Sequence, residues 1–92
     1  MFIVVVRCEL HLPSSNSLKA KRAVLNRLKE RLRHGGAAVA EVEHADLWQR
    51  AALGMAVVSG NATHADELAS ALRHVVEREV EVVILDWSTE RY

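Results

Sequence analysis

Three cations stand at the start of a predicted helix, and two more follow along it. Lys19, Lys21 and Arg22 fall in or near the first turn, and Lys29 and Arg33 lie further along the same segment. The helix dipole disfavours positive charge at this end by about 0.3–1 kcal/mol per group, so stability alone does not account for them. Free backbone N–H groups and cations together make an anion site. These five residues are therefore candidate ligands for the phosphates of structured RNA.

The alternative is a helix face whose cations are solvated or paired with acids. Glu41, Glu43 and Asp46 follow the helix and are the candidate partners. Charge runs are commonly no more than solvated surface, and the sequence leaves both interpretations open. The strand aromatics on which RRM-type modules stack bases are missing, so the RNA contact predicted here is to phosphates.

A second segment gathers acids, a histidine, a tryptophan and an arginine around one strand connection. Its possible pocket residues are Glu41, Glu43, His44, Asp46, Trp48, Gln49 and Arg50. The acids and His44 could bind a metal, but their spacing matches no structural zinc pattern. They could also act as general acid and base, but no nucleophile or oxyanion device accompanies them. We therefore expect no catalytic residue, metal or cofactor. We favour an arrangement in which Trp48 pins the connection onto the sheet and Arg50 pairs with an acid.

Hydropathy patterns predict six elements in the order strand, helix, strand, strand, helix, strand. Ser17 closes a turn segment of good N-cap residues, and Gly35-Gly36 ends the first helix. Thr63 and Asp66 resemble a capping box at the second helix. The predicted strands cover residues 2–12, 37–43, about 51–59 and 80–87, the helices begin at residue 18 and near residue 63, and residues 88–92 form a polar tail.

This order of elements predicts one ferredoxin-like βαββαβ domain over residues 1–92, an α+β sandwich with a four-stranded antiparallel sheet and both helices on one face. On the opposite face, Ile3 and Val5, together with Val39 or similar apolar groups, would stay uncovered, and such apolar patches usually mark contact surfaces. We therefore expect a homodimer through this face or a strand edge. The helices should cover the face that is apolar throughout, which carries Phe2, Val4, Val6, Cys8, Leu10 and Leu12.

Composition bounds the class of protein. The 92 residues are 50% hydrophobic and carry no net charge, which excludes a disordered chain. The charge is nevertheless segregated, because residues 1–34 have a net charge of +6 and residues 35–92 a net charge of −6. Cys8 is the single cysteine, and neither a signal peptide nor an apolar run of about 20 residues is evident. We expect a cytoplasmic protein that does not associate with membranes.

Two segments of the chain, one at the start of the first helix and one around the second and third strands, match a known sequence pattern. The segments Ser17-Leu18-Lys19-x-Lys21-Arg22 and Ala40 to Ser59, with Trp48-Gln49-Arg50 at the centre of the second, resemble the YlxP-like family of small bacterial proteins of unknown function. The resemblance covers nearly the whole chain and implies a ferredoxin-like fold, with no established activity or cofactor. The family's genes often lie among those for transcription termination, translation initiation and ribosome maturation, which implies a link to RNA or ribosomes. One departure is Ala20, where the resemblance implies an acid.

The leading hypothesis is a non-catalytic binding module that docks on structured RNA or a ribosomal particle through its basic first helix. One alternative is a self-associating structural or protein-interaction domain, in which the +6 and −6 regions meet. A less favoured alternative is a small-ligand sensor or an enzyme that uses the segment from Glu41 to Arg50 as a pocket wall.

Overall fold

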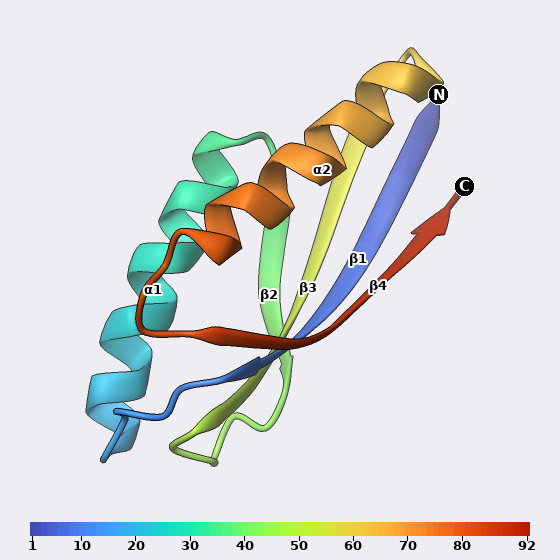
Figure 1. The fold of residues 1–92 in the computed structure, drawn as a ribbon. Coiled ribbons are helices and arrows are strands. Elements are labelled where there is room, and N and C mark those ends of the chain that lie inside the picture. The colour runs from blue at the N-terminus through green and yellow to red at the C-terminus, as the bar shows by residue number, and fades with distance from the viewer.

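Four strands form one antiparallel sheet, and two helices cover one of its faces (Figure 1). The computed structural model describes all 92 residues. The sheet order is β2-β3-β1-β4, which confirms the ferredoxin-like prediction. Helix α1 packs over the edge strand β2 and beside α2, while α2 packs over β1, β3 and β4. The elements are β1 (Phe2–His11), α1 (Leu18–His34), β2 (Ala38–Glu43), β3 (Arg50–Ser59), α2 (Ala62–Glu77) and β4 (Val83–Arg91).

The core lies between the helices and the predicted apolar face of β1. Side chains alternate across this strand, and every second one from Val4 to Leu12 is buried. Leu28 of α1 and Leu72 of α2 pack in the same core. Phe2 is the exception on this face and is 42% exposed. It lies beside the first turn of α2, where the cover by the helices begins.

The first helix is capped as predicted, but the second is not. Ser17 Oγ accepts the Ala20 N–H at 3.0 Å. At the second helix, Asn61 Oδ1 accepts the His64 N–H at 3.0 Å, and Thr63 lies inside the first turn. The predicted capping box is therefore wrong. Asn61 has the extended backbone that an N-cap requires, and asparagine accepts this bond as well as threonine does.

Strand β4 lies further along the chain than its apolar pattern predicted. Residues 88–91 continue the strand rather than forming a tail, with Arg91 opposite Val4 in the register with β1. Tyr92 and Ile3 exchange two backbone hydrogen bonds, of 3.0 and 2.8 Å. Backbone pairing extends this edge strand through polar residues, so hydrophobic alternation does not mark its end.

The face of the sheet opposite the helices, the open face, differs from the prediction in strand β2. Val39 points to the helix side and packs against the core, so it does not join Ile3 and Val5. Instead, Ala38 and Ala40 pair with the open-face residues of β3 and share their side of the sheet. Gly54 has a steric role here, because a Cβ at this position would lie 2.9 Å from a methyl group of Val42.

Neither helix combines the length and the apolar character that crossing a membrane demands.

Candidate functional site

One flank of α1 carries four of the five predicted anion ligands. Lys19, Arg22, Lys29 and Arg33 recur at spacings of three, seven and four residues, which places them on one side of a helix. Lys19, Arg22 and Arg33 are exposed, and Lys29 is half-buried. Only Arg33 has an acid nearby, Glu30 on the same helix at 3.7 Å. We call Lys19, Arg22, Lys29 and Arg33 the basic flank.

Lys21, the fifth predicted ligand, points into the protein. Its side chain is 2% exposed, with Nζ 2.8 Å from Glu41 Oε2. The same ammonium donates to the His44 carbonyl at 2.6 Å. Lys21 shares the core-facing stripe of α1 with Leu25 and Leu28, and a charge buried there needs partners. Lys21 is therefore paired with an acid, as the alternative interpretation of the helix cations expects, and it is not available to bind a phosphate.

On the other flank of α1, Arg27 and Arg31 pair with acids of the segment that precedes β4. Glu79, a buried acid, lies 3.3 Å from Arg27 Nη2 and 3.1 Å from Arg31 Nη1. Arg27 also donates to Glu81 at 2.5 Å. Burial is the largest single influence and raises the pKa of Glu79, but hydrogen bonding and the charges of Arg27 and Arg31 together outweigh it, so the net pKa is lowered. These pairs fasten α1 to the α2–β4 connection.

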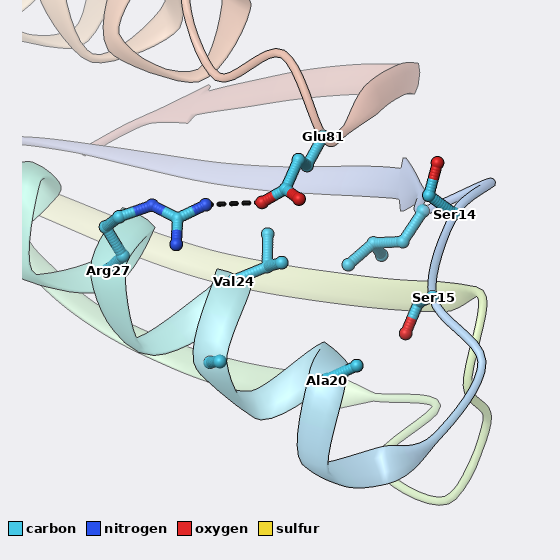
Figure 2. Close-up of a pocket in the computed structure, with 8 residues that line it drawn as sticks. Ser14, Ser15, Ala20, Val24, Arg27 and Glu81 are labelled. Atoms are coloured by element: carbon cyan, nitrogen blue, oxygen red, sulfur yellow. Dashed lines mark hydrogen bonds and ion pairs between the residues drawn. The ribbon is translucent and has the colours of Figure 1, made fainter.

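A pocket of about 260 Å³ opens beside these pairs (Figure 2). Its walls are Leu12 with the β1–α1 loop, the flank of α1 that carries Arg27, and Glu81. Arg27 and Glu81 are its charged residues, and they bind each other across its rim. Four of its eight lining residues are apolar, and it contains none of the seven possible pocket residues predicted between Glu41 and Arg50.

Those seven residues do not form one wall, because they are divided among the helix side of the sheet, its open face and the β2–β3 connection. Glu41 points to Lys21 on the helix side. On the open face, Glu43 lies 3.1 Å from Arg7, and Arg50 Nη2 lies 2.6 Å from Glu9 Oε2. Arg50 therefore has an acidic partner, as expected. The partner is Glu9 of β1, a pairing that the sequence does not predict because the two residues are 41 positions apart.

Glu9 is the centre of a charged network on the open face. Arg7 Nη2 and His44 Nε2 lie 3.0 and 3.1 Å from its Oε1. Hydrogen bonding with Arg50, His44 and Arg7, with Arg50 contributing most, lowers the pKa of Glu9 to about 2 and outweighs the opposing effect of burial. We call Arg7, Glu9, Glu43, His44 and Arg50 the Glu9 network.

The Glu9 network includes one group with metal-ligand geometry. Ligand atoms of Glu9, Glu43 and His44 lie within 4.8 Å of one another. Both carboxylates already accept hydrogen bonds or ion pairs from Arg7 or Arg50, and a cation bound here would have to displace or repel those guanidinium groups. This arrangement favours a network of ion pairs over a metal centre.

The β2–β3 connection is held by polar contacts, and Trp48 takes no part in holding it. The Gln49 amide donates to the carbonyls of Pro13 and Ser15, at 3.3 and 3.2 Å. Lys21 holds the other end through the carbonyl of His44, a residue with a φ of 66°. Trp48 is 55% exposed, so the expectation that it pins the connection to the sheet is wrong.

Comparison with known proteins identifies the family. The sequence model of a family described as "Protein of unknown function (DUF503)" matches residues 3–89. The chain belongs to the DUF503 family. It is 38% identical over 55 residues to the uncharacterized protein YlxP of Bacillus subtilis, a match that spans 59% of this chain and 60% of that relative. The resemblance stated from the motifs is thereby confirmed.

Two solved structures share the fold at low sequence identity. One is a C-terminal segment of the alpha subunit of aIF2 from Pyrococcus abyssi, with a TM-score of 0.58 and 15% identity over 90% of this chain and 49% of that one. The other is a de novo designed protein with ferredoxin fold, with a TM-score of 0.56 and 12% identity over 100% of this chain and 84% of that one. They show the architecture alone.

Proposed function

We propose that this DUF503 protein is a non-catalytic module that binds structured RNA, alone or within a ribonucleoprotein particle, through the basic flank of α1. The observation that carries the proposal is where the unpaired cations lie. Lys19, Arg22, Lys29 and Arg78 are the four Lys or Arg side chains without an acid within 4 Å, and three of them share this flank.

Folding gives Lys19 and Arg22 no electrostatic reason to be where they are. The first turn of α1 contains no acid, so Lys19 and Arg22 face the positive end of the helix dipole. A phosphate at this end would reverse the sign of the interaction, because it is attracted both to the dipole and to the two cations. From Lys19 to Arg33 the flank rises about 21 Å along the helix, at 1.5 Å per residue. It is therefore long enough to contact several phosphates.

Contacts of this kind predict binding with a steep salt dependence and little base preference. Each neutralised phosphate releases counterions, so affinity falls as salt concentration rises. Phosphate contacts carry no sequence information by themselves. The expected ligand is thus recognised by shape and charge.

The test compares two double variants that remove the same charge. Arg22→Gln/Lys29→Gln alters the basic flank, and Arg73→Gln/Arg78→Gln removes two cations from α2 and the residue that follows it. Binding to a structured RNA is measured by filter retention between about 50 and 200 mM salt. We expect the first variant to lose most of the affinity and to reduce the salt slope by about one to two. The control should bind nearly as the parent does. Equal losses in both variants, or no binding by the parent at low salt, would overturn the proposal.

Self-association is a second candidate, and the open face favours it. Val5, Val42 and Val58 are exposed there, beside the small residues Ala40 and Gly54. No helix covers this face (Figure 1). A second copy of the chain would bury these valines, and the molecular mass measured by sedimentation equilibrium decides between monomer and dimer.

A further inference from the structure

Two large apolar side chains project from a connection that is firmly anchored. Trp48 is 55% exposed and Leu47 is 45% exposed. The connection that carries them makes an internal hydrogen bond of 3.0 Å from the Leu47 N–H to the His44 carbonyl. The Leu12 N–H donates to the Gln49 carbonyl at 2.9 Å, which fixes the following residue. The tryptophan is therefore held in solvent by the fold, although burial of its ring would be favourable.

The anchors place Trp48 at the same end of the molecule as the start of the basic flank. Lys21 joins His44 to the first turns of α1, and Gln49 joins the other end of the connection to Ser15, just before the helix. The β2–β3 connection and the N-terminal end of α1 accordingly lie at one end of the sandwich (Figure 1). Lys19 and Arg22, both unpaired, extend from that end of α1.

We propose that Trp48 stacks on an unpaired nucleobase of RNA whose phosphates are held by Lys19 and Arg22. This inference rests on the proposed function and names the part of the RNA that the site takes, a single-stranded loop or end. An exposed indole beside a cationic surface is the combination that binds single strands, because every base offers a π face to the ring and its phosphate offers charge to the cations. A base in a duplex is already stacked on its neighbours and cannot meet the ring.

The polar groups near Trp48 argue for stacking without base selection. The side-chain nitrogen of Gln49 donates to two backbone carbonyls, so its N–H groups are not free to read a base edge. Asp46 is the one acid on the connection between His44 and Arg50. Its carboxylate repels phosphate, so the RNA backbone should approach from the α1 side, where the cations are.

The experiment uses the intact chain and two RNA probes of equal length, a single-stranded oligouridine and a blunt duplex. Trp48→Ala removes the ring, Trp48→Phe keeps a smaller one, and Leu47→Ala is the control for loss of exposed apolar surface. We expect Trp48→Ala to weaken binding of the single strand about tenfold and to leave binding of the duplex unchanged. Trp48→Phe should retain most of the affinity, and Leu47→Ala should bind as the parent does.

Tryptophan fluorescence provides a second measurement. The single strand should quench the emission of the parent, and this quenching should vanish in Trp48→Phe, where only Trp87 emits.

Each alternative outcome has a distinct meaning. If Trp48→Ala binds the single strand normally while Arg22→Gln/Lys29→Gln weakens binding of both probes, stacking is wrong and the proposed function stands. If Arg22→Gln/Lys29→Gln binds both probes as the parent does, the proposed function fails and this inference fails with it. Equal losses for Trp48→Ala and Leu47→Ala would overturn stacking in favour of a general apolar contact. Equal losses on the two probes for Trp48→Ala would overturn recognition of an unpaired base.

Discussion

His44 is the residue on which two ionic networks converge from opposite sides of the sheet. Its carbonyl accepts a hydrogen bond from Lys21 on the helix side, and its ring lies beside Glu9 on the open face. A left-handed backbone conformation at a non-glycine residue costs of the order of 1 kcal/mol, and the contacts at both ends hold it in place. Lys21 and Glu9 therefore position the β2–β3 connection.

Replacing Lys21 with methionine tests its structural role. Lys21→Met keeps most of the apolar length of the side chain but leaves Glu41 and the His44 carbonyl without their cation. We expect the free energy of unfolding to fall by about 3 kcal/mol, which is the lower end of the range for breaking a buried pair because Glu41 retains some solvent. Urea denaturation measures this change. Lys29→Met is the control, because Lys29 is half-buried and has no acidic partner; a loss for Lys21→Met no larger than the control's would contradict the role.

The Glu9 network makes stability depend on acid pH. The pKa of Glu9 is lowered from its ordinary value of 4.5 to about 2, chiefly by the hydrogen bond from Arg50. A carboxyl with a lower pKa when folded contributes stability that is complete above its unfolded pKa and disappears as the pH falls through the folded one. We expect the free energy of unfolding to drop between about pH 4.5 and pH 2, and to drop less in Glu9→Gln. Urea unfolding of both proteins near pH 5 and near pH 3 provides the comparison, in which equal drops would refute it.

At the scale of the elements, the pattern of apolar residues predicted the segments whose bounds are set by burial, but it missed the end of β4, which backbone pairing sets. Strand β1 and helix α1 begin and end close to their predicted bounds, because their apolar patterns coincide with the core. Residues 88–91 joined β4 through pairing with β1, which leaves no apolar signal.

The candidate site residues were likewise predictable only where a local pattern in the sequence marks them. The basic flank follows from helical spacing, whereas the pairing of Glu9 with Arg50 spans 41 residues and depends on strand register. The burial of Lys21 did have a local signal, its place in one stripe with Leu25, Leu28 and Leu32.

The N-cap of α2 gives a test at this scale, because two neighbouring residues compete for the role. Asn61→Ala removes the oxygen that accepts the His64 N–H and should cost about 1 kcal/mol of stability. Thr63→Ala should cost little or slightly stabilise, since Thr63 is inside the helix and alanine has the higher helix propensity. Urea denaturation of the two variants ranks them, and the opposite ranking would support the capping box in place of the Asn61 cap.

For the whole molecule, ion pairs consume much of the charge that is segregated along the chain. The pairs of Lys21 with Glu41, of Arg31 with Glu79 and of Arg50 with Glu9 each join the basic first third to the remainder of the chain. The halves thus neutralise each other in the fold to a large extent, and the unpaired positive charge that remains is concentrated on the basic flank. The flank lies on the helix layer, while the exposed valines lie on the open face of the sheet.

This separation leads to a prediction about self-association. Val58 is among the most exposed apolar side chains of the open face, so Val58→Asp places a charge in any interface formed there. We expect sedimentation equilibrium to report a dimer for the parent and a monomer for Val58→Asp. Val80→Asp is the control, because Val80 is 93% exposed in the α2–β4 connection, outside the sheet. A parent that stays monomeric at millimolar concentration would contradict the dimer. Because α1 covers the opposite face of the sheet, a dimer through the open face leaves the basic flank free, and Val58→Asp should bind RNA with the salt dependence of the parent.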